Sequence, residues 1–220
     1  MIYVLSDIHG RKDLFDSILQ QINLTDEDRL YVLGDVIDRN PYGIELLQKI
    51  MKMQNTSMIL GNHEHMMMAV VKHPSVFSNL RRWYGNGGEI THEKLDQLND
   101  KDREQILSFI DALPLSISIS VNGTDYLLVH GIPEETAKEI DCWGYEDEKQ
   151  AVVWERIDES TPLPSDKVVI FGHTPTSYYQ ECEPMRIWHG DKRIGIDCGA
   201  AYKEGRLSCL RLDDLTEFYS

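Results

Sequence analysis

The chain has 220 residues, 41% of them hydrophobic, and a formal net charge of −15 at pH 7. This composition excludes a disordered chain, and no apolar run approaches the ~18 residues that a membrane-spanning helix needs. Proteins bind nucleic acid by neutralising its phosphates with Lys and Arg, so a chain this acidic is not expected to have nucleic acid as a partner. We therefore expect a single domain over residues 1–220, located in the cytoplasm, with no nucleic-acid or membrane partner. Nothing in the sequence indicates an oligomeric state.

A rhythm of strand, polar loop and helix repeats through the first ninety residues. Short apolar runs of the kind found in buried parallel strands predict strands at 2–5, 30–33 and 57–60. Apolar residues at helical spacing predict helices over 14–22 and 44–50, and a Met-rich helix follows the third strand. Three such units in series predict a parallel sheet with right-handed crossovers, whose ligand site lies beyond the carboxyl ends of the strands.

Residues 72–113 are polar and mostly helical in pattern, and we interpret them as a helical insertion over or beside the site. Strand patterns dominate from Leu115 onward. Asn122-Gly123 predicts a hairpin turn between strands at 117–121 and 126–129. Further strands are predicted at 167–171 and, as a closing meander, at 185–188, 193–196 and 206–212.

Five short motifs each follow a predicted strand and offer Asp, Asn or His. These side chains are oxygen or imidazole ligands for divalent metals, and no thiolate is included. Each motif alone is weak, because a polar loop, a helix cap at Asn62 or a hydrogen-bonded histidine would explain it. Their joint occurrence, in order and at five strand ends, predicts a metal site. The motifs are Asp7–Gly10, Gly34–Arg39, Gly61–Glu64, Val129–Gly131 and Gly172–Thr174.

This set of motifs, which spans residues 7–174, resembles the calcineurin-like metallophosphoesterase family. Within the family it is similar to the branch that contains the Ser/Thr protein phosphatases of phage lambda and of bacteria. The resemblance implies an α/β fold, a four-layer α/β/β/α sandwich with two metal ions at one edge. It also implies hydrolysis of phosphate esters by in-line attack of a hydroxide that bridges the two ions.

The resemblance also assigns ligands to the two expected ions. One ion is expected to bind Asp7, His9 and Asp35, and the other shares the Asp35 carboxylate. The ligands of the second ion are expected to be Asp35, Asn62, His130 and His173. Oxygen and imidazole ligands suit several divalent metals, so we expect Mn first, with Fe or Zn as alternatives.

The residues that remain in the motifs are expected to act on the substrate. His63 is not a ligand in the family pattern, and we expect it to donate a proton to the departing alkoxide as a general acid. Asp38 is expected to orient the His63 ring. Arg39 is expected to bind the phosphate with its planar fork of donors, with Asn62 beside it. A second arginine, Arg156, is expected to join it, with a surface salt bridge as the alternative role.

The chain departs from the family pattern at two positions. Protein phosphatases usually carry Gly after the Asp-Arg pair, whereas this chain has Asn40 followed by Pro41. A residue before proline is pushed towards extended backbone, so we expect a changed turn at Arg39 and a shifted substrate preference. Pro175 stands where the nuclease and phosphodiesterase branches usually have a second His, which favours the phosphatase branch. Asn86–Gly88 resembles a stretch of the lambda-like branch; we interpret it as a flexible loop, with a lining role on the substrate side as the alternative.

Three functions remain in competition. The leading hypothesis is a metal-dependent phosphatase that acts on phosphoserine and phosphothreonine in proteins, or on small phosphate esters. The alternative is a diadenosine tetraphosphate hydrolase, which shares the metal core but often lacks the carboxylate that Asp38 provides here. A metal-binding regulatory module without turnover is the least expected, because the ligand positions and His63 are intact.

Overall fold

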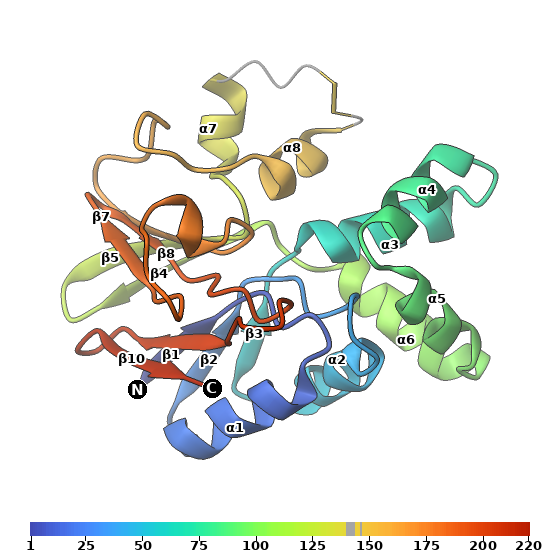
Figure 1. The fold of residues 1–220 in the computed structure, drawn as a ribbon, viewed down its shortest axis with the longest axis horizontal. Helices are drawn as coiled ribbons and strands as arrows, with labels where there is room; N and C mark the ends of the chain where they lie inside the picture. Colours follow the sequence, from blue (N-terminus) through green and yellow to red (C-terminus); the bar gives the residue numbers. More distant parts are fainter. Residues whose placement is uncertain (140–143, 146) are drawn as a thin grey trace.

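Two five-stranded sheets pack against each other in the structure, a computed structural model that describes residues 1–139, 144–145 and 147–220 (Figure 1). The first sheet has the order β10-β9-β1-β2-β3, and the second has the order β4-β5-β6-β8-β7. The first contains β1 (Ile2–Leu5), β2 (Arg29–Val32), β3 (Thr56–Met58), β9 (Ser208–Arg211) and β10 (Thr216–Tyr219). The second contains β4 (Ser116–Val121), β5 (Thr124–Val129), β6 (Val168–Phe171), β7 (Trp188–Gly190) and β8 (Arg193–Gly195).

Helices cover the outer faces of both sheets, with α1 and α2 beside the first sheet and α7 and α8 beside the second (Figure 1). Alternate side chains of β1 enter different layers: Tyr3 and Leu5 pack in the core shared with α1 and α2, and Val4 packs between the sheets. Strands buried on both faces read as continuous apolar runs, which explains the sequence pattern. The predicted four-layer α/β/β/α sandwich is thereby confirmed.

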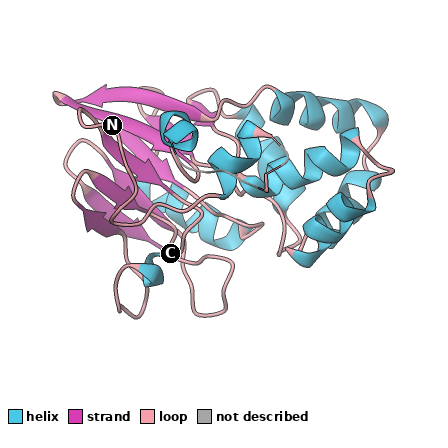
Figure 2. Ribbon diagram, turned by 90° about the horizontal axis from the view of Figure 1, so that it is seen from above, coloured by secondary structure: helices cyan, strands magenta, loops and turns pink. Residues whose placement is uncertain are grey.

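The first six described helices follow the predicted order along the chain, whereas α7 and α8 lie where the sequence predicted no helix. The first three alternate with the parallel strands β1, β2 and β3, and the next three occupy the segment interpreted as an insertion. Their bounds are Lys12–Ile22 (α1), Gly43–Lys52 (α2), Asn62–Lys72 (α3), Phe77–Gly85 (α4), Glu89–Asp96 (α5), Asp100–Asp111 (α6), Glu134–Glu139 (α7) and Glu148–Trp154 (α8). Figure 2 shows most helices gathered on one side of the molecule and the strands on the other. That residues 1–220 form one domain, with 72–113 as an insertion in it, stays our proposal.

Two strand predictions were wrong in detail. Met185–Ile187 form no strand, because side chains bind their carbonyls: Arg206 Nε donates to Met185 O at 2.6 Å. The closing strands also do not form one meander. β8 pairs in parallel with β6, whereas β9 crosses to the first sheet and pairs with β1, and β10, which was not predicted, completes that edge. The hairpin at Asn122-Gly123 is confirmed, and both residues have the positive φ values, 50° and 82°, that such a turn requires.

No helix among the described residues is long and apolar enough to cross a membrane.

Phe15 anchors α1 on the first sheet, and its replacement tests this core. Its side chain is fully buried in the cluster that joins the sheet to α1 and α2. We expect Phe15→Ala to lower the free energy of unfolding by about 3–5 kcal/mol, because it removes buried apolar surface and leaves a cavity. Denaturant unfolding measures the change. Phe77, 66% exposed, supplies the control: Phe77→Ala should cost about 0.5 kcal/mol or less, and equal losses would contradict this packing.

Candidate metal centre

The six predicted ligands lie at the carboxyl ends of strands from both sheets. Asp7 and His9 follow β1, and Asp35 follows β2 in the first sheet. Five of the six are buried, and His173 is partly buried. The remaining ligands come from the start of α3 and from the ends of β5 and β6: Asn62, His130 and His173.

The loops that carry these residues have unusual backbone conformations. Non-glycine residues rarely adopt positive φ, and such strain gathers at functional sites, where the surrounding structure holds it in place. Six of the predicted site residues adopt it here. They are Asp7 (56°), His9 (47°), Asp35 (55°), Asp38 (70°), Arg39 (67°) and His173 (61°).

Two clusters of potential ligand atoms share the carboxylate of Asp35. In the first cluster, atoms of His9, Asp35 and His63 lie within 4.8 Å of one another. His9 Nε2 lies 3.8 Å from Asp35 Oδ2 and 3.9 Å from Asp7 Oδ1. The cluster therefore includes His63, which the sequence analysis kept out of the ligand set, while Asp7 lies at its edge.

The second cluster joins Asp35 to His130 and His173. His130 Nε2 lies 3.4 Å from Asp35 Oδ2 and 2.9 Å from Asn62 Oδ1. His173 Nδ1 also lies 2.9 Å from Asn62 Oδ1, so this amide oxygen faces the same space as both rings. Carboxylate and amide oxygens with imidazole nitrogens form a donor set that divalent Mn, Fe or Zn accepts, and the shared Asp35 fits a two-metal arrangement.

Backbone carbonyls bind the outer nitrogen of each of the three predicted histidine ligands. Such contacts fix the ring orientation and leave the other nitrogen free for a metal ion. The contacts are His9 Nδ1 to Ile37 O at 3.1 Å, His130 Nδ1 to Leu33 O at 2.6 Å and His173 Nε2 to Trp154 O at 2.9 Å.

The pKa values in this cluster reflect buried charges close together. Burial raises the pKa of Asp35, but the attraction of His130 and His63 outweighs it, so the pKa lies well below its usual value. Burial lowers the pKa of His130, but the negative charge of Asp35 raises it by more, so the pKa lies above its usual value, at about 10. Burial and the neighbouring His130 lower the pKa of His173 to about 3. Burial and Asp197 raise the pKa of Asp7 well above its usual value. Buried carboxylates that raise each other's pKa repel one another when ionised, and a bound cation would stabilise their charged forms.

His63 and Asp38 form a buried pair beside the clusters. His63 Nδ1 lies 2.6 Å from Asp38 Oδ2, and the two side chains are 1% and 0% exposed. The other ring nitrogen, Nε2, lies 3.9 Å from Asp35 Oδ2 and 3.2 Å from Arg39 Nη2. One nitrogen of the His63 ring therefore contacts the Asp38 carboxylate, and the other faces Asp35 and Arg39.

A cavity of about 170 Å³ opens onto the clusters, and both predicted arginines, Arg39 and Arg156, line it. Arg156 also stacks over the Tyr178 ring at 4.6 Å, whereas no salt bridge to Arg156 is found among the described residues. The lining consists of Asp7, His9, Asp35, Arg39, Asn62, Asn86, Trp154, Arg156, His173, Pro175, Asp197 and Tyr202.

Asn40, which precedes Pro41, ends the turn that carries Arg39. Asn40 is not among the residues with positive φ; the left-handed positions are Asp38 and Arg39 before it. Its side chain ties this loop to the first one, because Asn40 Nδ2 donates to His9 O at 2.9 Å. An asparagine at this position therefore supports the loop through its amide, which a glycine lacks.

Two acidic site residues were missed from the sequence. Asp197 is 6% exposed and lines the cavity; burial and the charge of Asp35 raise its pKa to about 6. It directly follows β8 and Ile196, so the signal used for the other motifs, an Asp after an apolar run, was present. Glu64 is fully buried and accepts backbone N–H groups of Asp35 at 2.9 Å, Val36 at 2.9 Å and Ile37 at 3.3 Å.

Glu64 is expected to hold the loop that carries Asp35. We expect Glu64→Ala to lower the free energy of unfolding by several kcal/mol, because each buried N–H left without a partner costs about 1–3 kcal/mol. Glu64→Gln keeps a carbonyl oxygen and should lose less. Thermal or denaturant unfolding of both variants checks this order, with the exposed Glu45→Ala as control. A loss in Glu64→Ala no larger than in the control would contradict the assignment.

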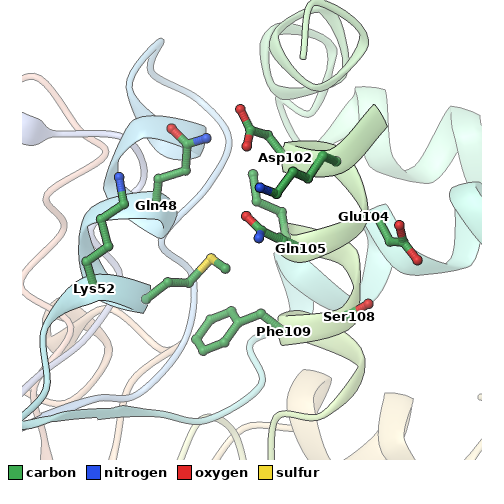
Figure 3. Close-up of a pocket in the computed structure, with 10 residues that line it drawn as sticks. Gln48, Lys52, Asp102, Glu104, Gln105, Ser108 and Phe109 are labelled. Atoms are coloured by element: carbon green, nitrogen blue, oxygen red, sulfur yellow. The ribbon is translucent and has the colours of Figure 1, made fainter. Parts of the chain in front are cut away.

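A separate groove lies between α2 and α6 (Figure 3). Gln48 and Lys52 face Asp102, Gln105 and Phe109 across it. Its lining contains no imidazole and none of the six predicted ligands, so this groove is separate from the candidate metal centre.

The chain is similar to relatives with two different activities. It is 29% identical over 160 residues to a symmetrical bis(5'-nucleosyl)-tetraphosphatase of Acidovorax ebreus, covering 70% of this chain and 52% of the relative. It is 28% identical over 189 residues to serine/threonine-protein phosphatase 2 of Salmonella typhimurium, covering 80% of this chain and 81% of that one. The chain thus spans about half the length of the tetraphosphatases it matches first.

Solved structures support the fold. A putative diadenosine tetraphosphatase has a TM-score of 0.66 at 17% identity, covering 100% of this chain and 92% of that one. A protein-tyrosine phosphatase of a Shewanella species has a TM-score of 0.61 at 18% identity, covering 99% and 79%. The family model for calcineurin-like phosphoesterases matches residues 1–200, and the buried His/Asp clusters fit a two-metal site. The chain therefore belongs to the calcineurin-like phosphoesterase family.

Proposed function

We propose that the chain hydrolyses phosphate monoesters of alcohols, most of all phosphoserine and phosphothreonine in proteins, with His63 as the proton donor to the leaving group. The observation that carries this proposal is the buried pair of His63 Nδ1 and Asp38 Oδ2, 2.6 Å apart, beside the ligand clusters. An alkoxide is a poor leaving group and needs a proton, so a positioned general acid accelerates its departure.

We assign the ligands as the resemblance implied. Asp7, His9 and Asp35 would hold one divalent ion, and Asp35 would bridge to the other. The second ion would take Asp35, Asn62, His130 and His173. When bound, two such ions polarise phosphoryl oxygens and lower the pKa of a water molecule that attacks phosphorus in line. Metal identity is left to measurement, with Mn first and Fe or Zn as alternatives.

The substrate phosphate would lie in the cavity between Arg39 and Arg156. Both side chains line it, together with Asn62. A guanidinium offers two parallel N–H donors to phosphate oxygens, so two arginines can fix the phosphoryl group without covalent contact. Arg39 Nη2 lies 3.2 Å from His63 Nε2, which supports a phosphate contact beside the proposed proton donor.

Symmetrical cleavage of a dinucleoside tetraphosphate is the second candidate, and similarity favours it over the first. Several of the relatives that match the chain are symmetrical tetraphosphatases, beside the protein phosphatases. The leaving group would then be a nucleoside diphosphate, a more stable anion than an alkoxide. Such a reaction depends less on a general acid, so the Asp38–His63 pair supports the first candidate instead.

One substrate panel separates these candidates. The purified chain, loaded in turn with Mn²⁺, Fe²⁺ and Zn²⁺ and analysed for bound metal, is incubated with a phosphoserine peptide, diadenosine tetraphosphate and p-nitrophenyl phosphate. Release of inorganic phosphate from the peptide, at a higher kcat/KM than dinucleotide cleavage, supports the first proposal. Release of ADP from the dinucleotide as the dominant activity overturns it in favour of the second. A folded, metal-loaded chain that cleaves none of the three would instead be a binding module.

A further inference from the structure

Asp38 receives two hydrogen bonds on a single carboxylate oxygen. Its side chain is completely buried, and Oδ2 accepts from His63 Nδ1 at 2.6 Å and from Trp83 Nε1 at 2.9 Å. The other oxygen, Oδ1, has no hydrogen-bond partner among the described residues. Among the described residues, His63 and Trp83 are therefore the two side chains that donate to the buried Asp38 carboxylate.

Trp83 belongs to α4, which lies in the 72–113 segment rather than in the sandwich. Its side chain is fully buried, and Gly88 lies against the indole: a Cβ atom at Gly88 would come within 2.2 Å of the ring. Gly88 N also donates to Trp83 O at 3.0 Å. Gly88 thus leaves room for the ring and holds the Trp83 backbone, a role the sequence did not reveal.

The same segment makes two further bonds to the loop that carries Asp38. Thr91 Oγ1 accepts the backbone N–H of Asp38 at 3.0 Å, and Gly87 O accepts the N–H of Arg39 at 3.0 Å. Asp38 and Arg39 are both in the left-handed backbone region, which costs free energy unless neighbouring groups hold it. The helical segment supplies these neighbours.

We propose that Trp83 is a positioning residue for the proton donor: its indole N–H fixes the Asp38 carboxylate, which in turn holds His63. This inference rests on the proposed role of His63. Rotation about the last side-chain bond of Asp is soft, so the bond from His63 alone leaves the carboxylate plane free. A second, charge-assisted hydrogen bond from the fully buried Trp83 ring restricts that rotation and offsets part of the cost of burying the charge.

The main test removes the indole N–H and varies the leaving group. We expect Trp83→Phe to lower kcat on an alkyl phosphate such as the phosphoserine peptide on the order of tenfold, the size expected for a lost hydrogen bond to a charged group. On p-nitrophenyl phosphate, whose leaving group needs little protonation, the loss should be within about twofold. Metal content should stay unchanged. An equal loss on both substrates would overturn the proposal, because a general disturbance of the site does not depend on the leaving group.

A matched control makes the same exchange elsewhere. Trp188 lies in β7, stacked on Tyr179 with ring centroids 4.3 Å apart, and does not line the cavity. Trp188→Phe should leave both reactions unchanged. If its loss showed the same dependence on the leaving group, the effect would not belong to Trp83.

The path through Asp38 is tested by combining substitutions. In an Asp38→Ala background, Trp83→Phe should cause no further loss on the alkyl phosphate, because residues that act as a unit are not additive. Full additivity would overturn the proposal. If Trp83→Phe fails to fold, benzothienylalanine at position 83 keeps the shape of the ring, lacks the N–H, and should give the same dependence on the leaving group.

Failure of the inference and failure of the proposed function give different results. If His63→Ala loses activity on the alkyl phosphate far more than on p-nitrophenyl phosphate and Trp83→Phe does not, only the inference fails. If His63→Ala itself shows no such dependence, the role of His63 is wrong and Trp83 has no proton donor to position.

Discussion

Asp35→Asn is expected to remove both metal ions together, with a loss of kcat/KM greater than 100-fold. Asp35 is common to both ligand clusters, and its Oδ2 lies 3.4 Å from His130 Nε2 and 3.8 Å from His9 Nε2. Changes outside the ligand shell typically cost about 10–100-fold in affinity or activity, so loss of a shared ligand should cost more. Asparagine has nearly the same shape and tolerates the left-handed backbone, φ 55°, that this position requires.

Elemental analysis of the purified variant, together with its activity, checks this expectation. Asp13→Asn serves as the control, because the Asp13 side chain is 64% exposed and lies away from the clusters. The control should keep the metal content and activity of the parent protein. An Asp35→Asn protein that retained one ion at full occupancy would show that the carboxylate does not bridge.

His63→Ala is expected to lower turnover on phosphomonoesters by about 10²–10⁴-fold while the metal content stays close to that of the parent. The structure makes this separation of effects a sharp test, because ligand atoms of His63, His9 and Asp35 lie within 4.8 Å of one another. His63 Nδ1 is bound to Asp38, so Nε2, 3.2 Å from Arg39 Nη2, is the nitrogen that would bind a metal ion or give a proton.

Metal analysis and single-substrate kinetics on the same preparation decide between these roles. Loss of one ion per chain in His63→Ala would make His63 a ligand and refute its assignment as proton donor. His189→Ala is the matched control, because His189 is 41% exposed and pairs with Glu217 at 2.8 Å, outside the cavity. It should change neither quantity.

The sequence predicted those parts of the structure that local pattern decides. Strand-end positions of Asp7, Asp35 and His130 follow from apolar runs that stop at a polar motif, because parallel strands end at one edge of a sheet. The hairpin at Asn122-Gly123 follows from the positive φ that its turn requires. These features depend on a few neighbouring residues, and the structure agrees with them.

Features that depend on distant partners were not predictable in the same way. β9 pairs with β1 across more than two hundred residues of chain, and no local pattern distinguishes that partner from β8. Trp83 donates a hydrogen bond to Asp38 from a helix whose position is set by tertiary packing. In the sequence Trp83 reads only as an apolar core residue, so this hydrogen bond could not be predicted. Asp197 differs, because its place after an apolar run was visible.

The ligand clusters draw on both sheets, since Asp7 and Asp35 follow strands of one and His130 and His173 follow strands of the other. Ions bound between them would cross-link the two halves of the sandwich as well as activate water. A ligand that binds only the folded state adds to its stability in proportion to the logarithm of its free concentration. Catalytic competence and resistance to unfolding would therefore rise and fall with the same supply of cations, and metal depletion would weaken the contact between the sheets at its polar edge.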